Sequence, residues 1–325
     1  MTSLRVGLIG YGFVGKNFHA PLIRATAGLQ LVAVASSRPA EVRADLPTVE
    51  VLSPEVLLER PELDLVVIAS PNETHFRLAR TALLAGKHVV VDKPFTLDLT
   101  EAEELISLAG GRVLSVFHNR RWDSDFLAVR AAVAEGLIGR VVHFESHFDR
   151  YRPEVRDRWR ERPGPGSGVW FDLGPHLIDQ AIQLLGLPLK VQTTLACHRA
   201  GGQTDDWAHC LLHYEGCHAV LHAAMLVAGG SPRFVVHGET GSLIKRRSDV
   251  QEAQLLAGLR PDSPDWGLDP DPLEYWNAAG QMVPLRAPRG CQQNYYAELR
   301  DAILGTGPNP VTAQQACEVM RILTL

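Results

Sequence analysis

The sequence predicts an α/β protein with two domains, and three observations support this. The chain has 325 residues, more than one hydrophobic core usually fills. Short apolar segments alternate with helical patterns over residues 4–116, which is typical of a doubly wound parallel sheet. From residue 140 onward, strand-like runs follow one another with turn residues between them. We therefore expect a first domain over 1–121 and a second over 122–325, built on a large mixed, mostly antiparallel open sheet.

The first strand leads directly into a glycine-rich turn. Residues 4–9 are apolar, and Gly10, Gly12 and Gly15 follow with GxGxxG spacing before a helical stretch. The first glycine permits a tight turn, the second lets a pyrophosphate approach the backbone, and the third lets helix pack on strand. A strand, this motif and a helix together predict a Rossmann dinucleotide-binding site. The residues expected to contact the cofactor here are Gly10, Gly12, Phe13, Val14 and Gly15. The alternative is a glycine-rich turn without a ligand.

The end of the second strand indicates which nicotinamide cofactor is bound. Residues 30–35 form an apolar strand, which is followed by Ser36, Ser37 and Arg38, with no acidic residue before Glu41. An Asp or Glu at this place usually binds a free ribose 2′-hydroxyl. Two hydroxyls and a guanidinium suit a 2′-phosphate instead, so we expect NADP(H), with NAD(H) as the alternative.

Three further strands are expected at residues 64–69, 88–91 and 112–116, with helices between them. The run from Thr100 to Glu103 has the pattern of a capping box. Ligands of such sheets bind at the carboxyl ends of the strands. The residues expected to face the cofactor there are Pro71, Asn72, His75, Asp92, Lys93, Asn119 and Arg121. Two alternatives are open: Pro71 and Asn72 as a simple helix start, and His75 as a surface residue.

The stretch from Gly168 to Asp179 contains the strongest candidate for acid–base chemistry. If a helix begins near Leu173, Asp172 and His176 lie four residues apart on one side of it. A carboxylate beside an imidazole is a common acid–base arrangement. The structural alternative is that Asp172 caps the helix, with Pro175 in its first turn and His176 packed inside.

Arginine is concentrated between Arg150 and Arg162. Tyr151 and Arg152 are expected to line the substrate pocket, because guanidinium donors and an aromatic wall suit a polyhydroxylated ring. For Arg156, Arg158 and Arg160 a solvated loop with acidic partners is an equally open interpretation.

Strands of the second domain are expected at 140–148, 191–198, 207–214, 217–226, 233–237 and 242–245. A zinc site is suggested by a group of possible ligands, namely His209, Cys210 and His213 with nearby Cys217 and His222. On a strand, however, Cys210 points away from the two histidines, so we predict no metal site. The free face of this sheet is expected to join subunits in a homodimer or homotetramer.

Bulk composition excludes several classes of partner. The formal net charge is −5, which offers no attraction to nucleic acid or anionic lipid and favours a small-molecule partner. Five cysteines without paired spacing indicate reduced thiols. Targeting and membrane-spanning patterns are missing from the sequence, so we expect a cytoplasmic protein that binds neither nucleic acid nor membrane.

Several motifs together resemble the family of glucose–fructose oxidoreductases and inositol dehydrogenases (Gfo/Idh/MocA). They are the glycine loop, Asp92-Lys93-Pro94 and the run from Asp172 to His176. The runs 118–123, 150–155 and 172–180 most resemble NADP-dependent scyllo-inositol dehydrogenases within that family. Two positions depart from the family pattern: Asp92 stands where Glu is usual, and Pro175 where Ser is common.

The resemblance implies an enzyme that oxidises a CH–OH group of a cyclic polyol or sugar reversibly, with hydride passing to or from NADP(H). It implies that His176 is the general base, that Asp172 orients it, and that Lys93 stabilises the alkoxide and contacts cofactor and substrate. Asn119 and Arg120 are expected to hold neighbouring hydroxyls. Two alternatives are open: a glycosidase that retains its nicotinamide cofactor, and a non-catalytic NADP(H)-binding redox sensor.

Overall fold

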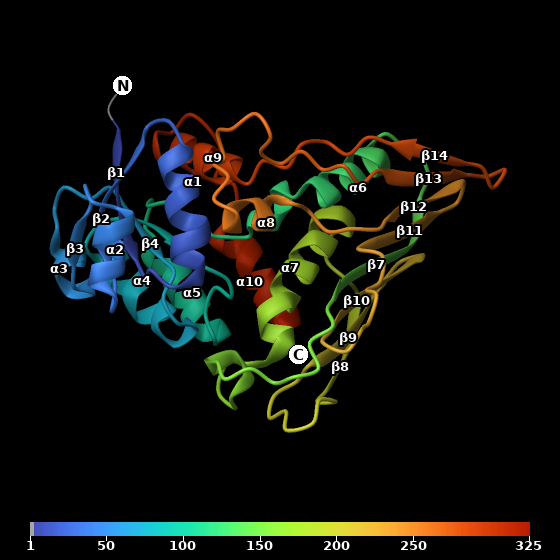
Figure 1. Cartoon of the computed structure of the whole chain (residues 1–325), viewed down its shortest axis with the longest axis horizontal. Coiled ribbons are helices and arrows are strands. Elements are labelled where there is room, and N and C mark those ends of the chain that lie inside the picture. The colour runs from blue at the N-terminus through green and yellow to red at the C-terminus, as the bar shows by residue number, and fades with distance from the viewer. Residues whose placement is uncertain (1–2) are drawn as a thin grey trace. The chain divides into compact units, whose positions relative to one another are not determined.

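The computed structural model describes residues 3–325 and divides the chain into two compact units (Figure 1). The first unit contains the residues up to Asn119 together with Gln251–Trp266 and Cys291–Met320. The second contains Arg120–Val250, Gly267–Gly290 and Arg321–Leu325. A second domain running without interruption over 122–325 is therefore wrong, because two later segments return to the first unit.

The first unit is built on a six-stranded parallel sheet with strand order β3-β2-β1-β4-β5-β6. This order reverses direction at β1, which defines a doubly wound sheet and confirms the predicted fold. The strands are β1 (Leu4–Ile9), β2 (Leu29–Ala35), β3 (Glu50–Leu52), β4 (Leu65–Ile68), β5 (His88–Val91) and β6 (Leu114–Val116). All four residues of β4 are buried, as expected for a central parallel strand with both faces covered.

Helices of the first unit connect and cover these strands. They are η1 (Gly15–His19), α1 (Ala20–Ala25), α2 (Pro39–Asp45), α3 (Pro54–Glu59), η2 (Asn72–Thr74), α4 (His75–Leu84), α5 (Leu99–Leu108), α8 (Gln251–Leu256), α9 (Gln293–Ile303) and α10 (Ala313–Leu323), the end of which belongs to the second unit. The predicted capping box at Thr100 is wrong: Asp98 caps α5 by accepting from the Thr100 amide at 2.6 Å. The short helix η3 (Asn119–Trp122) crosses the boundary between the units.

The second unit contains an eight-stranded sheet with strand order β14-β13-β12-β11-β7-β10-β9-β8. Only β7 and β10 pair in parallel among its described strands, so the predicted mixed, mostly antiparallel sheet is confirmed. The strands are β7 (Val141–Asp149), β8 (Lys190–Ala196), β9 (Trp207–Tyr214), β10 (Cys217–Ala224), β11 (Phe234–Gly238), β12 (Gly241–Lys245), β13 (Leu273–Asn277) and β14 (Met282–Leu285). Helices α6 (Ser124–Ala134), α7 (Gly168–Leu185) and η4 (Trp159–Glu161) complete this unit, and α7 runs beside β7 and β10 in Figure 1.

The two faces of this sheet differ in chemistry. Phe144, Ser146 and Phe148 of β7 are buried on the face that packs on α7. The opposite face is half-exposed and rich in histidine, because the strand register aligns histidines of β7, β9 and β10 in rows. One row joins His209, His222 and His147, and another joins His213, His218 and His143. Cys210 is buried on the other face, away from His209. Association of subunits through the histidine-rich face stays a prediction.

A buried arginine stabilises the packing between sheet and helix in this unit. Arg233 is 1% exposed and lies between the rings of Phe148 and Phe234, 3.9 and 4.0 Å from their centroids. Its guanidinium donates to Ser146 of β7 and to Gln180 of α7 and is 3.3 Å from Asp125 of α6. Burial lowers its pKa to about 10, so the group stays charged at neutral pH.

In the described part of the chain, no helix has the length and apolarity needed to cross a bilayer.

Candidate functional site

The glycine loop of the first unit has the shape that a pyrophosphate requires. Gly10 has φ +100°, and a Cβ there would lie 2.4 Å from the Ala69 carbonyl oxygen. A Cβ on Gly15 would lie 2.0 Å from the Gly10 carbonyl oxygen, so both positions exclude side chains. A Cβ on Gly12 would meet nothing within 4 Å. The loop therefore packs tightly on the protein at Gly10 and Gly15 and leaves open space at Gly12. This arrangement fits a dinucleotide.

Basic side chains gather at the end of β2 beside this loop. Arg38 donates from Nη2 to the Tyr11 carbonyl oxygen at 2.7 Å, and its Nη1 lies 3.0 Å from Glu41. Its backbone amide donates to Ser36 Oγ at 3.0 Å. Lys16, which the sequence prediction missed, pairs with Glu41 at 2.9 Å. Lys16 could have been identified from its position four residues after Gly12, because one helical turn brings its side chain back beside the loop.

Tyr11 in the glycine loop is held by Asp45 of α2. Its hydroxyl donates to Asp45 Oδ2 at 3.3 Å, and burial, reinforced by that carboxylate, raises the pKa of Tyr11 to about 12. The phenol is therefore neutral at physiological pH and acts as a donor within the unit.

The loops after β4 and β5 are connected by His75. This ring is 1% exposed, with Nδ1 at 2.9 Å from the Pro94 carbonyl oxygen and Nε2 at 3.0 Å from that of Ser70. The alternative of a surface residue is therefore wrong, and His75 joins two loops instead of facing solvent. The Pro71–Asn72 pair does begin a short helix, η2, and Asn72 is buried.

Lys93 follows a buried carboxylate and precedes a cis peptide bond to Pro94. Asp92 accepts from the Lys93 amide at 2.9 Å, and His19 Nε2 lies 3.9 Å from the same oxygen of Asp92. Burial lowers the pKa of His19 to about 4, so that imidazole is neutral at pH 7 and leaves the Asp92 charge uncompensated by it. The Lys93 side chain is half-exposed.

Helix η3 contains two arginines with different environments. Arg121 is buried and donates three hydrogen bonds to the Asp179 carboxylate of α7, at 2.7–3.2 Å. The structure therefore holds Arg121 against α7, and its contact with the cofactor stays a prediction. Arg120 pairs with Asp123 at 3.0 Å and stacks over the Phe148 ring at 4.9 Å. Asn119 is buried at the last position of the first unit.

Helix α7 begins five residues earlier than predicted. Its first residue is Gly168, with φ +89°, so Asp172 lies inside the helix and Pro175 is an interior residue. The cap comes from the loop before β9, because the Trp170 amide donates to Asp205 Oδ2 at 2.7 Å and the Val169 amide to the Asp205 carbonyl oxygen at 2.9 Å. The alternative in which Asp172 caps the helix is therefore wrong.

Asp172 is paired with Arg160 instead of a helix terminus. Arg160 Nε lies 3.3 Å from Asp172 Oδ1, and both side chains are mostly buried. His176, one turn further along α7, is 6% exposed, and its ring centroid lies 6.3 Å from that of Phe148. A small cavity of about 10 Å³, enough for about one water molecule, adjoins Asp172, Arg160 and Asp205.

The predicted pair Tyr151 and Arg152 is separated by strand alternation. The chain stays extended beyond β7, where Tyr151 bridges to Leu226. Tyr151 is 62% exposed and falls on the opposite side from Phe148, whereas Arg152 falls on the same side. The prediction of Tyr151 as the aromatic wall is therefore wrong, and Phe148, which the sequence analysis missed, is the aromatic residue beside His176.

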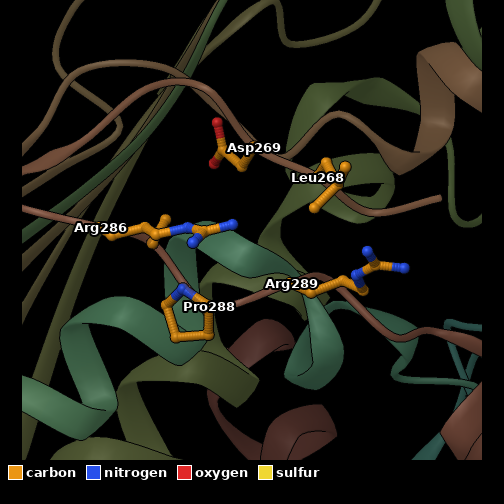
Figure 2. A pocket seen from close by; sticks show the side chains of 6 residues that line it. Leu268, Asp269, Arg286, Pro288 and Arg289 are labelled. Atoms are coloured by element: carbon orange, nitrogen blue, oxygen red, sulfur yellow. The ribbon is translucent and has the colours of Figure 1, made fainter. Parts of the chain in front are cut away.

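A further pocket of about 350 Å³ in the second unit contains none of the predicted site residues. It is lined by Leu268, Asp269, Arg286, Ala287, Pro288 and Arg289. Figure 2 shows the Arg286 side chain between Asp269 and Pro288. The Asp269 carboxylate accepts from Ser124 Oγ at 2.7 Å and lies 3.0 Å from Lys245 Nζ, which also pairs with Asp271 at 2.6 Å.

Two protein-family models match this chain, one in each unit. Residues 4–118 match an oxidoreductase family with an NAD-binding Rossmann fold, and residues 126–244 match the GFO/IDH/MocA C-terminal domain. The chain belongs to the GFO/IDH/MocA oxidoreductase family. The predicted resemblance is confirmed, and so is the expectation of an oxidoreductase.

Individual relatives cover nearly the whole chain. The uncharacterized oxidoreductase YdgJ of Escherichia coli is 52% identical, over 99% of this chain and 95% of its own. The scyllo-inositol 2-dehydrogenase (NADP(+)) IolW of Bacillus subtilis is 35% identical, over 99% and 92% respectively. The crystal structure of an oxidoreductase from Klebsiella pneumoniae is similar to this chain, with a TM-score of 0.95 and 56% sequence identity. The match covers 100% of this chain and 92% of that chain.

Proposed function

We propose that this oxidoreductase transfers a hydride between NADP(H) and a secondary alcohol or ketone of a cyclic polyol or sugar. The observation that carries the proposal is the placement of Asp172 and His176 four residues apart in α7, with Arg160 Nε 3.3 Å from Asp172 and His176 buried beside Phe148. The similarity of this chain to the NADP-dependent IolW, at 35% identity, supports both the substrate class and the cofactor.

Three residues carry the proposed reaction. A bound nicotinamide would supply the hydride chemistry that interconverts the alcohol and the ketone. His176 removes the hydroxyl proton as general base, and Asp172 orients its ring and stabilises the imidazolium that forms. The Lys93 ammonium stabilises negative charge on the substrate oxygen. Arg120 and Asn119 are proposed to hold neighbouring hydroxyls.

The proposed preference for NADP(H) rests on Arg38. Its guanidinium is fixed beside the glycine loop by the Tyr11 carbonyl and Glu41, and it is 53% exposed, so it remains accessible to a 2′-phosphate. Lys16 also lies at this place, but its ammonium is paired with Glu41 at 2.9 Å and with Asp45 at 2.8 Å, so the proposal relies on Arg38.

Steady-state kinetics with inositol isomers and aldoses test the reaction. We expect kcat to fall by about 10²–10⁴ in Lys93→Ala and in His176→Ala, because each removes a group that acts in the transition state. The dissociation constant for NADP⁺ should change little in His176→Ala. Arg162→Gln, an exposed variant from the same unit, serves as the control. Near-normal turnover in both alanine variants would refute the assignment.

A cofactor-retaining glycosidase is the alternative on this scaffold. It would cleave a glycosidic bond without net change in the absorbance of reduced cofactor, whereas a dehydrogenase changes that absorbance in proportion to product. A redox sensor would bind NADP(H) and turn over none of the alcohols.

A further inference from the structure

Strand alternation places two arginines on the α7-facing side of the second unit. Phe144, Ser146 and Phe148 occupy that side within β7, and Phe148 adjoins His176. The chain remains extended afterwards, since the Arg150 amide donates to Ala224 at 2.9 Å and the Arg152 amide to Met225 at 2.7 Å. Residues 150 and 152 therefore follow Phe148 on the side that carries His176 and Asp172.

The Arg152 guanidinium is a half-buried cation in a cationic environment. Burial lowers its pKa, and Arg150, Arg156 and Arg158 lower it further, while Asp172 acts in the opposite direction. Its guanidinium makes no hydrogen bond or ion pair with any residue that the structure describes. The charge of Arg152 is therefore poorly compensated by the protein itself.

Neighbouring carboxylates are already paired with other arginines. Glu161 lies 2.8 Å from Arg158 and 3.1 Å from Arg199, and Asp206 lies 2.9 Å from Arg199. Asp172 is engaged by Arg160 at 3.3 Å. An anion from outside the chain is the partner that would balance Arg152.

We propose that Arg152 binds an anionic group of the substrate, and that the substrate is an acidic sugar or polyol such as a uronate. A carboxylate or phosphate accepts two parallel hydrogen bonds from a guanidinium, which orients the ring as well as binding it. This inference rests on the proposed function, since it names the class of substrate for the same site. It gives Arg152 a role in selecting acidic over neutral rings.

The test compares matched substrates that differ only in charge. The values of kcat/KM with NADP⁺ are measured for glucose and glucuronate, galactose and galacturonate, and glucose 6-phosphate. We expect the native enzyme to prefer an acidic member by at least about tenfold. In Arg152→Gln that preference should fall by about 10–100-fold while neutral sugars change little, and Arg152→Lys should retain part of it. Comparing glucose 6-phosphate with glucuronate distinguishes recognition of a phosphate from recognition of a carboxylate.

Arg162→Gln is the matched control, because Arg162 belongs to the same segment but is 65% exposed and paired with Asp157. Equal kcat/KM for neutral and acidic sugars, or an equal loss on both in Arg152→Gln, would overturn the proposal. If no alcohol is oxidised, the proposed function fails while the anion site is still decided by calorimetry. Glucuronate binding that Arg152→Gln abolishes supports the site, and no binding to the native protein refutes it.

Discussion

The ion pair between Arg160 and Asp172 joins an arginine-rich segment to the proposed acid–base pair. Arg160 belongs to the short helix η4, which the sequence analysis left open between pocket lining and a solvated loop. Its Nε lies 3.3 Å from Asp172, while its guanidinium stacks on the Trp159 ring at 4.5 Å. This contact favours the ionised form of Asp172, which is the form that stabilises a protonated His176.

Arg160→Gln should move the acidic limb of the pH dependence of kcat/KM upward by about 0.5–1 pH unit. Without the guanidinium, the Asp172 carboxylate takes up a proton more readily. An ionised Asp172 that is no longer paired with Arg160 also stabilises protonated His176 more strongly. Both effects move the acidic limb of the profile to higher pH. A pH profile of native enzyme, Arg160→Gln and the control Arg162→Gln checks this. A uniform loss of rate with an unchanged profile would assign Arg160 a purely structural role.

At the residue scale, the sequence predicted residue types better than their orientation. The pair Asp172 and His176 keeps its spacing inside α7, because four residues return to the same helix face wherever the helix starts. Tyr151 was misplaced because the extended chain continues past Asp149 and sets its side by alternation. The partner of Arg121 was not predicted, because Asp179 lies 58 residues later, beyond the reach of local patterns.

Among the elements, the start of α7 illustrates a cap that no local pattern reveals. Ser167 precedes the helix but makes no side-chain cap, and Asp205 supplies it from a loop 35 residues further along the chain. Gly168 is required there, since a Cβ would lie 1.8 Å from Asp205 Oδ1. In contrast, α10 has a local capping box, in which Thr312 and Gln315 exchange two hydrogen bonds at 3.2 Å. The distant cap of α7 could not be predicted, and the local cap of α5 was predicted at Thr100 where Asp98 supplies it.

Asp205→Ala should lower the free energy of unfolding by about 1–2 kcal/mol, because it removes the acceptor of the Trp170 amide in the first turn of α7, while the Val169 amide keeps the backbone carbonyl of residue 205. Asp205→Asn retains an acceptor oxygen and should lose less. Burial raises the pKa of Asp205, so the native state holds this proton more tightly than the unfolded chain does. Stability contributed by the protonated group therefore declines as the pH rises above about 4 through the raised value. Urea titrations at two pH values measure both effects; equal stability of the native protein and Asp205→Ala would contradict the cap.

On the scale of the whole molecule, the order of elements was predictable and the path of the chain was not. Apolar runs and alternation located most strands of both sheets, because buried strands leave a strong periodic signal. β3, β13 and β14 were missed, since their residues are largely half-exposed or exposed and β14 contains Pro284. The return of Gln251–Trp266 and Cys291–Met320 to the first unit depends on contacts between distant segments, such as Tyr295 with Ser115 at 2.9 Å.

NADP⁺ should raise the thermal unfolding temperature of the protein more than NAD⁺ at equal concentration. Ligand that binds only the native state stabilises it by about 2.7 kcal/mol at 100 times its dissociation constant. Differential scanning fluorimetry across cofactor concentrations measures this without relying on turnover. Arg38→Gln should reduce the difference between the two cofactors, with Arg43→Gln on the same helix as a control. A larger shift with NAD⁺ in the native protein would overturn the cofactor preference.

The capping of α7 by Asp205 also sets an order of assembly. The amides of Val169 and Trp170 can find their acceptors only after the chain has been made and folded as far as the β8–β9 connection. The first turn of this helix is therefore held by a contact that spans 35 residues of sequence, from Trp170 to Asp205. The helix that carries the proposed acid–base pair thus depends on a loop that lies beyond β8, and a chain that ends before residue 205 would lack this cap.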